Sequence, residues 1–175
     1  MLQKILDAKD PKLRKKSKAI KKIDKKALSV IEDLKDTLAA QDDPEGIGLA
    51  APQIGKRLRI FVMKPEEKLK VIINPEVVKI SKSEKTNKKQ KESKIMEGCL
   101  SLPHFYGPIR RVDKIKIKYK DEKGKVKTEE FQGINAQIVQ HEMDHLDGIL
   151  FIDRLLEQKK PLYEYKNGEW ERVEI

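Results

Sequence analysis

The sequence predicts an α+β fold, in which helices lie before and after a series of short strands. Runs rich in β-branched and aromatic residues occupy the middle of the chain. Segments with apolar residues at three- and four-residue steps, the spacing of amphipathic helices, lie on either side of them. The regular alternation of strand and helix that a parallel sheet requires is not seen. At this length we expect residues 1–175 to form one domain.

The first helix is expected between Asp24 and Leu38, after a turn at residues 10–11. Its apolar positions follow helical spacing: Ile23, Ala27, Val30, Ile31, Leu34 and Leu38. Asp24 can cap the helix, because its carboxylate accepts hydrogen bonds from the unpaired amides of the first turn. The polar, proline-containing run 42–46 ends the helix.

A group of strands is expected next, after a glycine-bounded segment, residues 46–55, that is too rich in small residues for a solvent-exposed loop. Residues 59–63 and 71–73 have the composition of strands. Pro75 is expected to separate the second of these from a further strand over residues 77–80, because proline cannot donate a ladder hydrogen bond.

The second half begins with residues 81–94, which contain no apolar side chain and many lysines, so the sequence predicts a mobile loop there. In residues 115–119 apolar residues alternate with lysines. A turn at residues 121–124 then leads to a partner strand at 126–131. The two strands and the turn between them predict a β-hairpin. Helical spacing returns over residues 134–146.

The chain closes with a second predicted hairpin, in which Asn167-Gly168 lies between aromatic residues. The longest apolar runs have only four residues, such as 149–152, so no membrane helix is expected, and the start of the chain lacks the apolar core of a signal peptide. The single cysteine, Cys99, cannot form an internal disulfide and suits a reducing compartment.

The charge balance is strongly basic, with 39 Lys and Arg against 29 Asp and Glu, a formal net charge of +10. Such a surface attracts polyanions, but the favoured interpretation of the charge is a solvated lysine-rich surface. A non-enzymatic RNA-binding protein is therefore one hypothesis for the chain, although no recognised RNA-binding motif supports it.

The predicted helix at residues 134–146 carries the pattern H-E-x-x-H, from His141 to His145. Residues four apart lie on one face of a helix, so both imidazoles can bind one cation. Glu142 is offset by about 100° and lies beside that cation, where a base for a bound water belongs. Two apolar stripes predict that the helix is buried: Ile134 and Ile138 form the first, and Val139, Met143 and Leu146 form the second. Buried histidines favour a metal site over a pair of surface histidines.

A catalytic metal site of this kind needs a third protein ligand and an open position for water. Phe151 occupies the position at which a third histidine would follow in metzincins. Two residues are candidates for the third ligand: Glu164, downstream of the motif, and Cys99, in the segment Glu97–Ser101. Spacing alone does not decide between them. Glu164 as the ligand would make the chain a zincin-type endopeptidase. His104 is a weaker candidate ligand, and Asp144 either orients a ligand imidazole or pairs with a nearby cation or backbone amide.

Three segments, in this order along the chain, resemble the motifs of the peptide deformylase family. They are Gly46–Gln53 (GIGLAAPQ), Glu97–Ser101 (EGCLS) and Gln140–His145 (QHEMDH). The similarity of layout covers nearly the whole chain. The resemblance implies antiparallel sheets packed around a central helix that carries the H-E-x-x-H motif.

The resemblance also implies the reaction and its metal site. A metal ion held by Cys99, His141 and His145 would activate a water to attack the formyl carbon of an N-formylmethionyl peptide, with Glu142 as general acid and base, releasing formate. Ferrous iron is the expected metal, with zinc, nickel or cobalt as substitutes. Gln53, through its side-chain amide, and Leu100, through its backbone N–H, would stabilise the oxyanion.

Further residues are implied to bind the substrate: Ile47, Gly48, Glu97 and Gly98 along the channel, and Ile138 at the methionine pocket. Glu97 and Arg111 resemble an ion pair that fixes the cysteine loop. The implied partners are nascent formylated peptides and, transiently, the ribosome, with no membrane and no sequence-specific nucleic acid. A bacterial-type cytoplasmic enzyme is expected, and an organelle enzyme would look the same. The basic helix by which some bacterial relatives dock on the ribosome is missing from the final residues, and the lysines of residues 79–94 are a candidate replacement.

Overall fold

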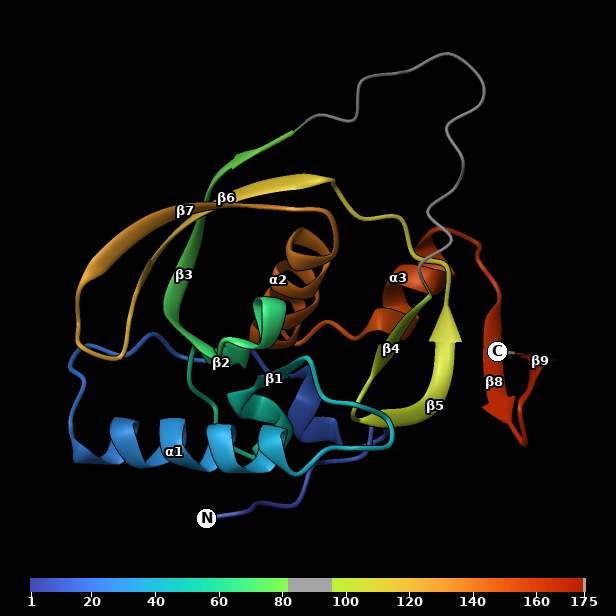
Figure 1. Ribbon diagram of the computed structural model, residues 1–175, viewed down its shortest axis with the longest axis horizontal. Coiled ribbons are helices and arrows are strands. Elements are labelled where there is room, and N and C mark those ends of the chain that lie inside the picture. Colours follow the sequence, from blue (N-terminus) through green and yellow to red (C-terminus); the bar gives the residue numbers. More distant parts are fainter. Residues whose placement is uncertain (82–95, 175) are drawn as a thin grey trace.

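The computed structural model describes residues 1–81 and 96–174, which form two antiparallel sheets and three α-helices (Figure 1). The larger sheet has the strand order β1-β2-β3-β6-β7, in which every neighbouring pair is antiparallel. Its strands are β1 (Gly48–Ala50), β2 (Ile60–Met63), β3 (Lys70–Ile80), β6 (Lys114–Lys120) and β7 (Val126–Gln132).

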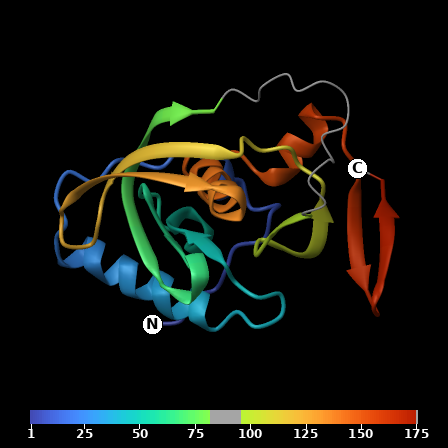
Figure 2. The ribbon, with the colours of Figure 1, turned by 45° about the horizontal axis from the view of Figure 1, so that its top comes forward.

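The smaller sheet has the order β4-β5-β8-β9 and is also antiparallel throughout. Its strands are β4 (Glu97–Cys99), β5 (Leu102–Gly107), β8 (Leu162–Lys166) and β9 (Glu169–Val173). The hairpin of β8 and β9 forms the outer end of the molecule (Figure 2). Its turn contains the predicted Asn167-Gly168 pair, and both residues have positive φ, 51° and 78°, as a tight hairpin turn requires.

The helices are α1 (Lys25–Ala39), α2 (Gly133–Leu146) and α3 (Phe151–Glu157). Asp24 caps α1 as predicted, because its side chain accepts a hydrogen bond from the Ala27 amide at 2.9 Å. Short 3₁₀-helices occur at Pro11–Arg14, Ala51–Ile54 and Pro65–Glu67. The second of these, with β1, makes up the buried small-residue segment that the sequence predicts.

The larger sheet is covered on both faces, which places α2 at the centre of the molecule (Figures 1 and 2). Residues of β2 alternate between the two cores: Phe61 and Met63 pack with α2, and Ile60 and Val62 pack with α1. All four are fully buried. The predicted α+β class and the central helix are therefore confirmed.

Two expectations about the strands and helices are corrected. Pro75 lies within β3 instead of separating two strands, because the register shifts between Ile73 and Glu76 and the chain passes the proline at this irregularity. The apolar stripe of α2 is not buried throughout, since Ile134 is 45% exposed at the start of the helix. The predicted loop at residues 81–94 lies outside the described residues, apart from Ser81.

None of the helices in the described part of the chain is both long enough and apolar enough to cross a membrane.

Candidate metal centre

The two histidines of α2 and the cysteine of β4 come together in the interior. One ligand atom from each of Cys99, His141 and His145 can be chosen so that all lie within 4.8 Å of one another. The Cys99 Sγ lies 3.3 Å from His145 Nε2, and both imidazoles are buried. The structure therefore joins the two motifs, far apart in the sequence, at one point.

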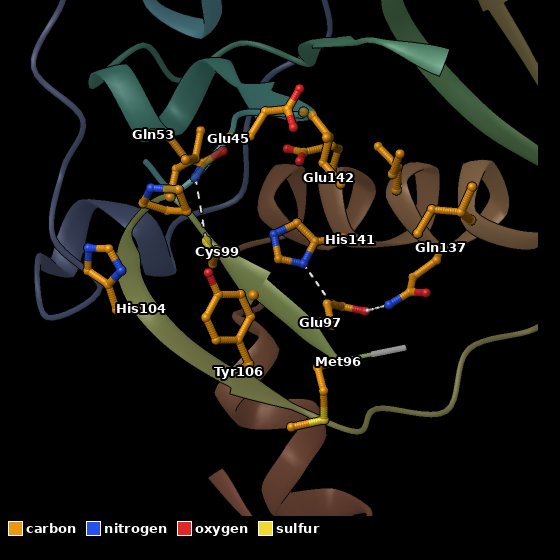
Figure 3. Close-up of a pocket in the computed structure, with 17 residues that line it drawn as sticks. Glu45, Gln53, Met96, Glu97, Cys99, His104, Tyr106, Gln137, His141 and Glu142 are labelled. Atoms are coloured by element: carbon orange, nitrogen blue, oxygen red, sulfur yellow. Dashed lines mark hydrogen bonds and ion pairs between the residues drawn. The ribbon is translucent and has the colours of Figure 1, made fainter. Parts of the chain in front are cut away.

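A buried carboxylate orients the first histidine. His141 Nδ1 lies 2.7 Å from Glu97 Oε1, which leaves Nε2 of the same ring for the centre (Figure 3). Arg111 donates to both oxygens of Glu97, at 2.6 and 3.0 Å, so the expected ion pair is present. Burial raises the pKa of Glu97, but its hydrogen bonds with His141 and Arg111 outweigh burial and lower that pKa to about 2. Glu97 is therefore an anion that fixes the orientation of the His141 ring.

Asp144, which could have oriented a ligand imidazole, pairs with two arginines instead. Arg111 Nη1 donates to Asp144 at 2.6 Å, and Arg154 Nη2 donates to it at 2.8 Å. Arg111 thus bridges Asp144 to Glu97, and through Glu97 reaches the imidazole of His141. This network ties α3 to the centre, because Arg154 belongs to α3.

Glu142 is buried beside the three candidate ligands with one oxygen, Oε2, that has no hydrogen-bond partner among the described residues. Burial raises the pKa of Glu142 to about 7. Its carboxylate approaches the backbone of Gly48 so closely that a Cβ there would lie 2.5 Å from Oε1. A carboxyl group held in this way can both take up and release a proton near neutral pH.

Gln53 turns its amide nitrogen toward the cysteine. Its Nε2 donates to Ser101 Oγ at 3.1 Å and lies 3.6 Å from Cys99 Sγ, whereas its Oε1 accepts from the Ala50 amide at 2.9 Å. The hydrogen bond from the Ala50 amide to Oε1 fixes the orientation of the Gln53 side-chain amide. A donor is therefore already aimed at the centre (Figure 3).

A pocket of about 210 Å³ opens onto the centre. It is lined by all the residues that the sequence assigns to substrate binding: Ile47, Gly48, Glu97, Gly98 and Ile138. Gln53, Cys99, Leu100, His141 and Glu142 line it too. The open side of the centre is thus accessible to a substrate.

The sequence assigned no role to Tyr106, Gln137 or Met96, which also line the pocket. Gln137 donates to Glu97 Oε2 at 3.1 Å. Its position one helical turn before His141 was the signal that could have revealed it. His104 lines the pocket but is not one of the three clustered ligands.

The residues fit a transition-metal cation. A thiolate and two imidazoles are the donor set that suits such a cation. Glu164, the rival third ligand, lies on β8 opposite Phe105 and outside the cluster of ligands among the described residues. A buried Cys-His-His centre beside an unpaired carboxylate and an open pocket defines the class of metal-dependent hydrolases.

Comparisons with known proteins identify the family. Residues 2–161 match the family model described as polypeptide deformylase. The peptide deformylase of Pseudothermotoga lettingae is 44% identical over 153 residues, covering 87% of this chain and 82% of that protein. That of Dictyoglomus thermophilum is 39% identical over 158 residues, covering 90% and 95%. The crystal structure of the Thermotoga maritima peptide deformylase superimposes with a TM-score of 0.76 at 37% identity, covering 88% and 97%.

The chain belongs to the peptide deformylase family. It is a hydrolase that removes the N-formyl group from nascent polypeptides, and the family uses a catalytic divalent metal ion. Both the zincin-type endopeptidase and the non-enzymatic RNA-binding protein are thereby set aside.

Proposed function

We propose that Cys99, His141 and His145 hold one divalent cation, ferrous iron in the cell, with zinc, nickel or cobalt able to replace it. The single observation that carries this proposal is the convergence of the three ligand atoms within 4.8 Å at the inner end of the pocket. A cation bound there supplies Lewis acidity, which lowers the pKa of a water and polarises the formyl carbonyl.

Glu142 is the general acid and base of the reaction. Its pKa of about 7 allows the carboxylate to accept a proton from the attacking water and then to donate it to the leaving amine. The free Oε2 makes this exchange possible without breaking an existing hydrogen bond. Burial supports the same role, because it keeps bulk water away from the carboxyl group.

Gln53 and Leu100 stabilise the negative charge that develops on the formyl oxygen, Gln53 through Nε2 and Leu100 through its backbone N–H. The position of the Gln53 amide supports this, because its other end is held by Ala50 before substrate arrives. A preorganised donor of this type contributes about 3 kcal/mol to transition-state stabilisation.

The substrate lies along Ile47, Gly48, Glu97 and Gly98, and Ile138 borders the methionine side chain. Gly48 and Gly98 allow close approach of the peptide backbone, because neither carries a side chain. The carboxylate of Glu97 points toward Arg111 and His141, so Glu97 contributes to the wall of the pocket while its charge positions the metal ligand.

The enzyme acts in the cytoplasm on chains that emerge from ribosomes, as one catalytic domain over residues 1–175, and contacts the ribosome transiently. The net charge of +10 and the lysines at 79–94 support the contact, since ribosomal RNA presents phosphates. Deleting residues 83–92 should weaken ribosome binding and reduce its salt dependence, while turnover of a short formyl-peptide stays the same. Unchanged ribosome affinity across a salt titration would exclude this role.

The metal assignment is tested with two variants, Cys99→Ala and Glu164→Gln, purified anaerobically. Cys99→Ala should lose bound metal and activity, and Glu164→Gln should keep both, because Cys99 clusters with the two histidines and Glu164 does not. Metal retained by Cys99→Ala but lost by Glu164→Gln would reverse the assignment.

A further inference from the structure

A run of lysines near the start of the chain has no part in the metal centre. Residues 12–26 contain nine Lys and Arg against one acidic residue, Asp24, which caps α1. Arg14 forms an ion pair with Asp153, and the eight lysines are exposed: Lys12, Lys15, Lys16, Lys18, Lys21, Lys22, Lys25 and Lys26. None of these residues lines the substrate pocket. The run is therefore a surface feature whose role catalysis does not explain.

Two further cations lie beside this run in the tertiary fold. The Lys18 amide donates to the backbone oxygen of Arg57 at 3.1 Å, and Arg57 Nε donates to the backbone oxygen of Lys16 at 2.7 Å. Arg57 and its neighbour Lys56 are both exposed. We call the eight lysines, Lys56 and Arg57 the basic strip. Its main segment, blue in Figure 1, runs along the outside of the molecule to the start of α1.

The backbone of the basic strip is anchored to the rest of the fold at regular intervals. The Ser17 amide donates to the backbone oxygen of Leu146, at the end of α2, at 2.8 Å. Ile20 exchanges two hydrogen bonds with the side chain of Asn74, at 2.9 and 2.7 Å, and Asp24 begins α1. The lysine side chains therefore project from a backbone that is already ordered, which reduces the conformational entropy lost when they bind a partner.

The cations of the basic strip are not balanced within the fold. Elsewhere lysines are paired, as Lys35 is with Glu32 and Glu122. Among the described residues, none of the eight lysines of the strip forms an ion pair. Lys25 and Lys26 lie in the first turn of α1, which contains no acidic residue and where the helix dipole disfavours cations. This placement costs stability, so folding does not explain it, whereas binding to an external anion does.

We propose that the basic strip is a docking surface for the phosphate backbone of RNA, through which the enzyme contacts the ribosome. The proposal rests on the proposed function, which places the enzyme at ribosomes, and it assigns the contact to an ordered surface. The strip is anchored where α2 ends, at Leu146, whereas the pocket is lined by residues 134–142 of that helix. RNA bound to the strip therefore leaves the pocket accessible to the emerging chain.

The apolar residues of the run favour RNA over a lipid surface as the partner. Leu13 is fully buried, and Ile20 and Ile23 are partly buried against the core beneath α1. No large apolar side chain of residues 12–26 is exposed between the lysines. Surface segments that bind membranes insert such side chains between the lipid headgroups. A purely cationic strip suits the phosphates of RNA instead.

The proposal is tested by the affinity of the full-length enzyme for a labelled RNA duplex of about 16 base pairs, measured by fluorescence anisotropy over a salt titration. The strip variant replaces four lysines by glutamine: Lys15, Lys16, Lys21 and Lys22. Its affinity should fall by about tenfold or more at about 50 mM salt. The slope of log K against log salt should become shallower by about 3 to 4, because each lysine that neutralises a phosphate contributes about 0.9.

A matched variant controls for net charge. It replaces four exposed lysines outside the strip by glutamine: Lys68, Lys114, Lys118 and Lys166. The two variants carry the same formal charge, and the control should bind RNA within about twofold of the wild type. An equal loss of affinity in both variants would show that only net charge matters, and wild-type affinity in the strip variant would exclude the strip. Either result overturns the proposal.

A second variant separates binding from folding. Replacing Lys25 and Lys26 by glutamate puts anions at the positive end of the α1 dipole, so the urea midpoint should rise while the affinity for RNA falls. A structural role of the two lysines would lower the midpoint instead. Unchanged affinity for RNA in this variant would contradict the proposal.

Ribosomes and formyl-peptides complete the test. The strip variant should co-sediment less with purified ribosomes than the wild type, and it should release formate from a short formyl-peptide at the wild-type rate. Wild-type co-sedimentation of the strip variant, or tighter binding of the wild type to phosphatidylcholine–phosphatidylserine vesicles than to RNA, would overturn the proposal. Absence of formate release from the wild type would instead refute the proposed function, and the RNA titration would still decide on the strip.

Discussion

At the scale of single residues, the proposed chemistry depends on one carboxyl group, that of Glu142, whose Oε2 has no hydrogen-bond partner among the described residues. Glu142 is flanked by His141, whose ring is fixed by Glu97, and it faces the backbone of Gly48. Its elevated pKa comes from burial, and its free oxygen faces no competing donor among the described residues. A carboxyl group with these properties can carry a proton during the reaction. It would bind a metal ion poorly, because a metal ligand must be ionised and the raised pKa of Glu142 disfavours ionisation.

The variant Glu142→Gln should bind metal normally and remain folded, but its kcat should fall by about 10²- to 10⁴-fold, because glutamine has the same shape and cannot carry the proton. Formate release and metal content should be measured on the same preparation. Glu130→Gln, on the exposed part of β7, is the matched control and should keep wild-type activity. Near-normal turnover of Glu142→Gln would show that another group moves the proton.

A methyl group at position 48 offers a steric test of the same carboxylate. Gly48→Ala places Cβ 2.5 Å from Glu142 Oε1, so the buried carboxylate must shift. We expect kcat to fall by about 10²-fold, the usual cost of misplacing a catalytic group by about 1 Å. Gly168→Ala, where nothing lies within 4 Å of the added Cβ, strains the β8–β9 turn through its φ of 78° instead of displacing the carboxylate, and should keep wild-type kcat. Wild-type kcat in Gly48→Ala would mean that the position of the carboxylate is not critical.

The sequence predicted the residues of α2 better than their partners. The two histidines and Glu142 lie within five consecutive positions, so helical geometry alone relates them. Cys99 and Glu164 could not be distinguished by spacing, because the choice depends on which strand the tertiary fold brings to α2. Asp144 was similarly open, since its partners Arg111 and Arg154 come from other segments.

At the scale of elements, regular and capped segments were predicted and irregular ones were not. The α1 helix has both helical spacing and an Asp24 cap, and both are present. β3 runs through Pro75 because the strand has an irregularity there, and next to it Asn74, at φ 50°, accepts a hydrogen bond from the Ile20 amide. α3 has only seven residues, too few for periodicity to reveal.

The cap of α1 provides a stability prediction that is separate from catalysis. Asp24→Ala removes the hydrogen bond to the Ala27 amide and should lower the free energy of unfolding by about 1 kcal/mol. Urea denaturation followed by circular dichroism measures this change. Asp24→Asn should retain most of the stability, because its side-chain oxygen can also cap. A loss of formate-releasing activity in folded Asp24→Ala would contradict the separation of α1 from the site.

At the scale of the whole molecule, α2 is enclosed by two sheets whose strands come together around it only in the tertiary fold. The larger sheet packs on its apolar side, and β4 of the smaller sheet brings Cys99 to its histidines. The α+β class follows from local patterns. The division into two sheets does not, because the pairing of β5 with β8 joins segments far apart in the chain.

The most direct test of this account is formate release from a formyl-Met peptide by anaerobically purified enzyme, with elemental analysis of the same sample. We expect about one ferrous ion per chain and activity that is lost on removing the metal and restored by iron, nickel or cobalt. Exposure to air should lower activity, because a ferrous centre with a thiolate ligand is easily oxidised. Formate release that continues after the metal is removed, or none from metal-loaded enzyme, would contradict the account.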